Sequence, residues 1–160
     1  ALGFQVLMAA RAAKNGATLQ ECKAIAEKAR KQSGVFFVVD TLEFLHRGGR
    51  IGGAARLLGT ALNLKPILTV IDGKIEPVAR VRTQRKAFEK MLNILEEKLD
   101  HGSISRLSVL HANAASQADQ LMSELVERFH PAETIMTEVS PVIGTHTGPG
   151  TVGVAYLIDM

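Results

Sequence analysis

A histidine near the C-terminus lies in a segment whose residue types suggest a binding loop. His146 stands within the run Gly144-Thr145-His146-Thr147-Gly148-Pro149-Gly150. Glycine lets a backbone approach a ligand closely, and proline fixes the course of the chain. An imidazole in such a loop can donate a hydrogen bond to an anion near neutral pH. Taken alone, the heptapeptide is equally compatible with a rigid turn that carries an incidental histidine.

A second group of residues suited to anion chemistry consists of arginines. They occur in two stretches, Arg47, Arg50 and Arg56, then Arg80, Arg82 and Arg85 with Lys86 beside them. Arg80 and Arg82 are two residues apart in an expected strand, so their side chains should point to the same face. The planar guanidinium matches phosphate geometry, which suggests an acidic partner or a transferring phosphoryl group. A solvated strand face is the alternative.

Other catalytic and metal-binding patterns find no support in the sequence. The five histidines show no paired ligand spacing and there is one cysteine, so no metal site is expected. Gly148-x-Gly150-x-x-Gly153 formally matches a dinucleotide fingerprint. That motif must open a helix, whereas the seven residues that follow here predict a strand. No serine nucleophile elbow occurs. The sequence therefore assigns neither a catalytic residue nor a cofactor.

The sequence predicts helices and strands in alternation. The first expected helix runs from Leu2 to a stop at Asn15-Gly16, and the second follows the Thr18–Glu21 capping box as far as about Arg30. Further helices are expected after Asp40, over 53–64, over 84–99 and after Ser116. Strands are expected over 35–39, 106–111, 134–139 and 153–158, with a hairpin over 67–81 that turns at Asp72-Gly73. Since Pro77 cannot donate to a ladder, its strand should be an edge or carry a bulge. The order predicts an α/β domain with a mixed sheet packed by helices.

The expected helix over 53–64 is unusually apolar. Its apolar face consists of Ala54, Leu57, Leu58, Ala61 and Leu62, and Arg56 is its single charged residue. A helix of this kind is normally buried in a core, or it lines an apolar cavity. The sequence leaves both readings open.

Three segments, in their order and spacing, resemble the DegV family of bacterial fatty-acid-binding proteins. They are Asp40 to Ile51, Lys65-Pro66-Ile67 with the Asp72-Gly73 turn, and Gly144 to Gly153. The resemblance covers nearly the whole chain. It implies a carrier, not an enzyme, that buries one long-chain fatty acid in an apolar tunnel between two domains. The carrier presents the carboxylate to a separate fatty-acid kinase, which makes acyl-phosphate for phospholipid synthesis.

The resemblance also implies roles for particular residues. His146 would hydrogen-bond the carboxylate of a palmitate- or oleate-like ligand, with Thr145 and Gly148 beside it. The tunnel candidates are Leu57, Leu58, Ala61, Leu62 and Ile67. Arg50 and Arg82 would contact the kinase or the transferring phosphate. The flanking threonines could equally cap the turn.

The resemblance further predicts the domain organisation. The family's N-terminal domain supplies hydroxyl groups to the carboxylate, and the chain begins at Ala1-Leu2-Gly3-Phe4 without a counterpart of that domain. We therefore expect residues 1–33 to be helices leading from a missing N-terminal domain. Residues 34–160 should be the DegV-like C-terminal domain.

Composition narrows the function classes. With 160 residues, 46% apolar and 22% charged, the chain fits one globular domain. The formal charge is +3, no block of basic residues occurs, and 4% aromatic residues offer few stacking platforms, so nucleic acid is not an expected partner. No apolar run approaches the ~20 residues of a membrane span. The single Cys22 excludes an internal disulfide and suits the cytoplasm.

Two other functions remain open from the residues. One is an enzyme that uses His146 as general acid or base on a small anionic substrate, which would need a second group within reach. The other is a nucleic-acid-binding regulator, suggested by a pI of about 9.2 and the arginines. The resemblance favours the lipid carrier over both.

Overall fold

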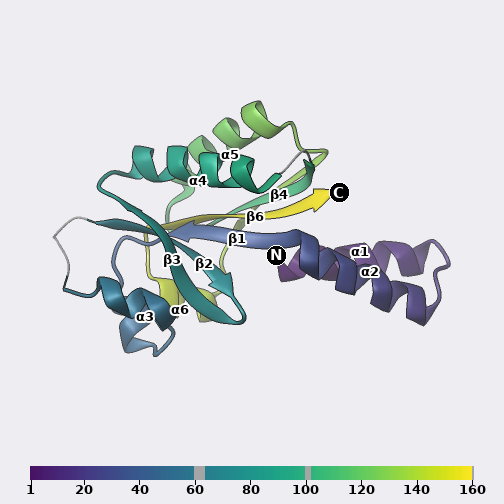
Figure 1. Ribbon diagram of the computed structural model, residues 1–160, viewed down its shortest axis with the longest axis horizontal. Helices are drawn as coiled ribbons and strands as arrows, with labels where there is room; N and C mark the ends of the chain where they lie inside the picture. The colour runs from purple at the N-terminus through teal and green to yellow at the C-terminus, as the bar shows by residue number, and fades with distance from the viewer. Residues whose placement is uncertain (60–63, 100–101, 160) are drawn as a thin grey trace.

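A six-stranded mixed sheet forms the centre of the molecule (Figure 1). The computed structural model describes residues 1–59, 64–99 and 102–159. The elements in chain order are α1 (Leu2–Lys14), α2 (Leu19–Gln32), β1 (Ser33–Val38), α3 (Glu43–Arg47), the 3₁₀ helix η1 (Gly52–Leu57), β2 (Lys65–Ile71), β3 (Lys74–Val81), α4 (Gln84–Leu99), β4 (Ser103–Ala112), α5 (Ala115–Phe129), β5 (Glu133–Glu138), α6 (Pro141–Thr147) and β6 (Thr151–Asp159). The strand order is β3-β2-β1-β6-β4-β5. The expected mixed α/β architecture is confirmed.

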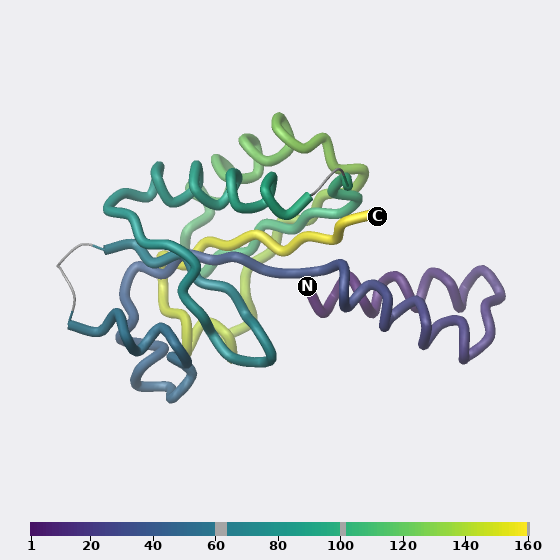
Figure 2. The backbone as a smooth tube through the Cα atoms, viewed as in Figure 1, coloured from purple at the N-terminus to yellow at the C-terminus, as the bar shows by residue number. Residues whose placement is uncertain are grey.

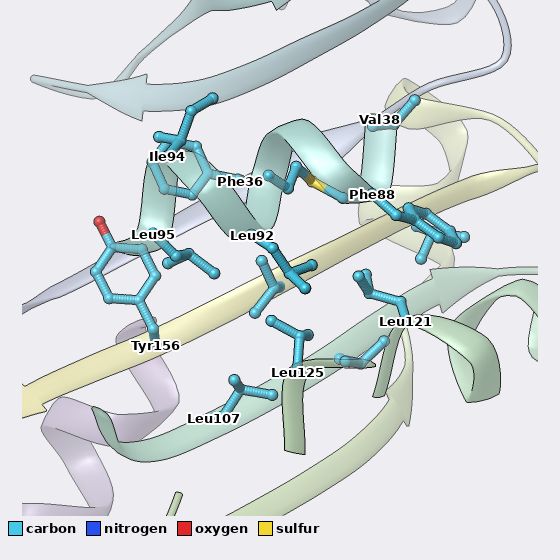
Figure 3. Close-up of a cluster of buried hydrophobic side chains, with 14 of the residues drawn as sticks. Phe36, Val38, Phe88, Leu92, Ile94, Leu95, Leu107, Leu121, Leu125 and Tyr156 are labelled. Atoms are coloured by element: carbon cyan, nitrogen blue, oxygen red, sulfur yellow. The ribbon is translucent and has the colours of Figure 1, made fainter. Parts of the chain in front are cut away.

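The parallel pair of strands explains the position of one helix. β4 and β5 are parallel, whereas the other neighbours in the sheet are antiparallel. A parallel connection needs a crossover, and α5 supplies it. α4 and α5 lie side by side on one face of the sheet (Figure 1). Their apolar stripes include Phe88, Leu95, Leu121 and Leu125, which are fully buried against the sheet (Figure 3).

The opposite face is covered by short elements. β1 buries side chains on both faces, because Phe36 and Val38 point to α4 and α5 whereas Phe37 and Val39 point the other way. Alternation of this kind in a continuously apolar run is typical of a central strand. Phe37 and Val39 pack with Leu45, Ala54 and Leu68 beneath α3 and η1. Figure 1 shows α3 and α6 on this face.

α1 and α2 form a helical pair that projects from the body of the molecule (Figure 2). The predicted capping box is present, since Thr18 Oγ1 accepts from the Glu21 amide at 3.3 Å and the Thr18 amide donates to Glu21 Oε2 at 2.7 Å. The pair is anchored where Phe4 and Ala29 are buried against β6. None of the helices in the described residues is long and apolar enough to cross a membrane.

The hairpin of β2 and β3 has the predicted turn and edge. Asp72 and Gly73 both have positive φ, 48° and 76°, as a type I′ turn requires. β3 is an edge strand, and the register shifts between Ile67 and Leu68, whose partners are Ala79 and Pro77. The extra residue in this bulge is next to proline, as the missing donor predicts.

Several local predictions were wrong. Asp40 does not cap α3, because Thr41 Oγ1 accepts from the Glu43 amide instead at 3.2 Å. Ser116 does not cap α5, which begins at Ala115. The helix expected over 53–64 is a 3₁₀ helix that ends at Leu57, and residues 60–63 lie outside the described residues.

Candidate functional site

His146 lies in the last turn of a helix rather than in a loop. Ser140 Oγ accepts from the Ile143 amide at 3.5 Å, and Pro141 occupies the first turn of α6. Serine before proline is a helix start signal, because proline's missing donor is not needed there. Gly148 ends the helix with φ 78°. The Ser140-Pro141 start signal is present in the sequence, but Gly144, Gly148 and Gly150 favoured the prediction of a loop.

The imidazole of His146 is packed against the end of α3. A Cβ atom placed on Gly48 would fall within 3.0 Å of His146 Nδ1 and Cε1, so the ring fits there because Gly48 has no side chain. Nδ1 is fully enclosed and has no hydrogen-bond partner among the described residues. His146 as a whole is half-buried. Nδ1 is therefore the nitrogen held against Gly48, which leaves Nε2 as the nitrogen to contact a ligand.

Two further glycines hold the same two segments together. A Cβ on Gly148 would collide with the ring of Phe44, and a Cβ on Gly150 would collide with the carboxylate of Asp40. Both glycines have positive φ, 78° and 81°. Asp40 also forms an ion pair with Lys65, the first residue of β2. The three segments that carry the family resemblance therefore meet around Asp40.

The polar groups next to His146 mostly bond within the segment. Thr145 Oγ1 donates to the Pro141 carbonyl at 2.8 Å, and the Gly148 amide donates to the Gly144 carbonyl at 2.8 Å. Thr145 and Gly148 are thus close to His146 in the chain, but these donors are engaged by α6 itself. Thr151, which the sequence did not single out, is buried, and its hydroxyl donates to the Gly148 carbonyl at 2.8 Å.

Large apolar side chains are exposed beside His146. Val142 is 71% exposed and Ile143 is 49% exposed, and they precede His146 by four and three residues on the same side of α6. Phe44, which contacts Gly148, is 36% exposed. An apolar surface of this kind beside a hydrogen-bonding group is a common property of binding sites.

The tunnel candidates do not all lie together. Leu57 is half-buried and Leu58 is 40% exposed at the end of η1, whereas Ala61 and Leu62 lie outside the described residues. Ile67 is fully buried on the other face of the sheet, in the cluster beneath α4 and α5. Because side chains alternate along a strand, Leu68 points to the face of η1 and α3 instead.

The two singled-out arginines lie in different places. Arg50 follows α3 and is exposed. Its Nη1 donates to the carbonyl of Gly48 at 3.2 Å, and Gly48 is the residue against which the His146 ring packs. Arg82 is exposed just after the last residue of β3, in the turn before α4. Arg47 and Arg56, by contrast, pair with Glu43 at 2.5 Å and Glu76 at 3.8 Å.

Comparison with protein families identifies the chain's relatives. Residues 1–159 match the model described as "Uncharacterised protein, DegV family". A DegV domain-containing protein of Clostridium acetobutylicum is 41% identical over 158 residues, which cover 99% of this chain and 55% of the relative.

Solved structures of similar chains have the same fold. A DegV family protein of Thermus thermophilus, whose structure is named for fatty acid binding, matches with a TM-score of 0.91 at 38% identity. The match covers 97% of this chain and 56% of the other. DegV of Bacillus subtilis, named as a fatty acid binding protein, matches with a TM-score of 0.82 at 32% identity over 98% and 56% of the two chains.

The chain spans a little over half the length of these relatives. The family model nonetheless matches almost every one of its residues, and the fold agrees with those of the solved relatives. These findings confirm the resemblance read from the three segments. The chain belongs to the DegV family.

Proposed function

We propose that this chain is part of a carrier that binds one long-chain fatty acid and holds its carboxylate at His146. The observation that carries the proposal is the placement of His146. Its Nδ1 is enclosed against Gly48, and the exposed Val142 and Ile143 precede it by one turn of α6. Two relatives with the same fold, at 38% and 32% identity, are named for fatty acid binding.

The free energies of apolar burial and of hydrogen bonding suggest different roles for the apolar and polar groups of the site. Burial of acyl CH₂ groups contributes about 0.8 kcal/mol each, so the acyl chain should supply most of the affinity. A single hydrogen bond to a charged carboxylate contributes about 1.5–3 kcal/mol, enough to fix which end faces outward. His146 therefore sets orientation, and apolar residues such as Leu57 and Leu58 hold the chain.

The proposal includes a second domain. Because the relatives are nearly twice as long, we place residues 1–33 as a helical connection and residues 34–160 as the domain that carries His146. The exposed apolar side chains on α6 would then face the other domain or the acyl chain. A ligand enclosed on both sides loses more water than one on an open surface.

The carrier would present the carboxylate to a fatty-acid kinase. Arg50 donates to the carbonyl of Gly48, against which His146 packs, and Arg82 offers a second guanidinium on an exposed turn. A guanidinium matches phosphate geometry, so both are candidates to contact the phosphoryl donor. The free thiol of Cys22 agrees with a cytoplasmic site of action.

The enzyme alternative receives no support from the geometry. A general acid or base needs an orienting partner or a second reactive group within hydrogen-bond reach. Among the described residues, His146 Nδ1 has no such partner.

Native mass spectrometry with organic extraction tests the proposal. The protein is purified from a bacterial host at the length of its relatives. We expect one fatty acid per chain to copurify. A protein that carries no lipid and takes up neither palmitate nor oleate would contradict the proposal.

A further inference from the structure

A hollow of about 470 Å³ lies at the other end of the sheet from His146. It is formed by the first residues of β1, the last of β6, the β2–β3 hairpin and the last turn of α4. Gly34, in its wall, precedes Asp40 by six residues, which places it roughly 20 Å away along the strand direction. The volume falls within the usual range of small-molecule pockets.

Two stacked aromatic rings line the hollow. Phe36 and Tyr156 have ring centroids 5.7 Å apart. Figure 3 shows the Tyr156 ring at the margin of the core cluster, with its hydroxyl pointing away from Leu125 and Leu107. Gly34 makes room for this hydroxyl, because a Cβ there would fall within 3.0 Å of its oxygen. The hydroxyl forms no hydrogen bond within the described residues and is not among their enclosed polar atoms.

The charges around the hollow are mostly positive. Lys31 and Lys98 line it, both are exposed, and neither pairs with an acidic residue in the described part of the chain. Lys98 Nζ lies 6.0 Å from the centroid of the Phe36 ring. The carboxylate that lines the hollow, Glu76, is held by Arg56 at 3.8 Å. The hollow therefore offers two unpaired ammonium groups and one free hydroxyl to an anion.

The remaining wall is apolar and open to solvent. Ile71 and Val78, both in the hairpin, are 55% and 42% exposed and line the hollow. With Val70, which is 47% exposed and also lines the hollow, they form an apolar surface at the end of the hairpin. A ligand that contacts both the lysines and the apolar side chains of the hollow needs an anionic end and an apolar body.

We propose that this hollow is a second binding site, separate from His146, for a small amphipathic anion. Its carboxylate or phosphate group lies between Lys98, Lys31 and the Tyr156 hydroxyl. Its apolar body covers Ile71 and Val78. Lysine recognises such groups as a compact point charge, so the site accepts either head group.

The single tyrosine makes the site directly observable. The chain has one Tyr and no Trp, so intrinsic fluorescence reports Tyr156 alone. The chain is titrated with octanoate, octyl phosphate, octanol and octyltrimethylammonium. We expect saturable changes with one or both anions, and binding of octanol and of the cation that is about tenfold weaker or less. Comparison of octanoate with octyl phosphate identifies the preferred head group.

Two lysine variants on α4 provide the matched comparison. Lys98→Gln should weaken anion binding about tenfold and leave octanol unchanged, because it removes one charged contact. Lys86→Gln, an exposed lysine in the first turn of the same helix, should bind as the parent does. Amide NMR shifts should concentrate at Gly34 and Thr69.

Any one of four results would overturn the second site. The first is the absence of a saturable change with either anion, and the second is equal binding of octanol and octanoate. The third is an equal loss in both lysine variants. The fourth is a pattern of amide shifts centred on Gly48 and Gly148, which would place the anion at His146 instead.

Discussion

His146 and Gly48 fit together so closely that a Cβ atom on residue 48 would overlap the imidazole ring. A Cβ on Gly48 would fall within 3.0 Å of His146 Nδ1. The two residues are almost a hundred positions apart, yet each sits at the C-terminal end of a short helix, α3 or α6. The orientation of the imidazole thus depends on the absence of one methyl group.

Gly48→Ala tests this dependence. Gly48 has φ −77°, which alanine adopts without strain, and the most severe clash of its Cβ is with the His146 ring. We expect fatty acid retention to fall about tenfold, the cost of one misplaced hydrogen bond to a charged group. Dissociation of a bound fluorescent fatty acid measures the effect.

Gly144→Ala is the matched control on the helix of His146. A Cβ there meets Val139 Cγ2 at 3.8 Å, an ordinary contact. Alanine also favours the helix over glycine. Parental retention in Gly48→Ala, or equal loss in both variants, would show that the packing against Gly48 does not position the ring.

Arg82→Ala should separate binding from phosphorylation. Arg82 is exposed in the turn after β3, and no contact in the described residues joins it to His146. We expect unchanged fatty acid affinity and about tenfold or more slower acyl-phosphate formation by a fatty-acid kinase, since a guanidinium stabilises phosphoryl charge. Arg85→Ala is the control, because Arg85 is exposed in the first turn of α4. Normal turnover of Arg82→Ala would exclude the assigned role.

Glu133 should connect the helical pair to the sheet in a pH-dependent way. Its carboxylate accepts from Arg11 of α1 at 2.7 and 2.8 Å and from Arg106 of β4 at 3.0 Å. The Arg11 hydrogen bond, the largest cause, and Arg106 lower the pKa of Glu133 to about 2. A lowered pKa stabilises the fold above the unfolded value of about 4.5, and this stability is lost as the pH falls towards 2.

Glu133→Gln should therefore lower the melting temperature by only about 1–3 °C at pH 7, because the ion pairs are partly exposed to solvent. The difference between variant and parent should begin to shrink below about pH 5 and vanish below pH 2. Thermal unfolding followed by circular dichroism measures it, with Glu138→Gln, exposed in the same strand, as control. A difference that is constant from pH 7 to pH 2 would show that charge is not its cause.

Local signals in the sequence predicted much of the fold. The Thr18–Glu21 capping box and the Asp72-Gly73 turn depend on a few adjacent residues, and both were found as predicted. Pro77 correctly predicted an edge and a bulge, because the missing donor acts wherever the strand lies.

The parts that depend on tertiary contact were harder to predict. Asp40 has the spacing of a helix cap, but its carboxylate is engaged by Lys65, which only the folded sheet brings near. Ile67 and Leu68 are equally apolar, and the choice of face depends on where α4 and η1 pack. His146 was recognised from its segment, whereas its partner Gly48 could not be, since nothing local relates them.

The most direct test of the account is fatty acid retention by His146→Ala in the protein at the length of its relatives. Native mass spectrometry compares the parent, His146→Ala and Gly144→Ala after identical purification and dilution. We expect one fatty acid per parental chain, the same for Gly144→Ala, and a loss of about tenfold or more in retention for His146→Ala. Equal retention by His146→Ala, with the same acyl-phosphate formation, would contradict the role of His146 in holding the carboxylate.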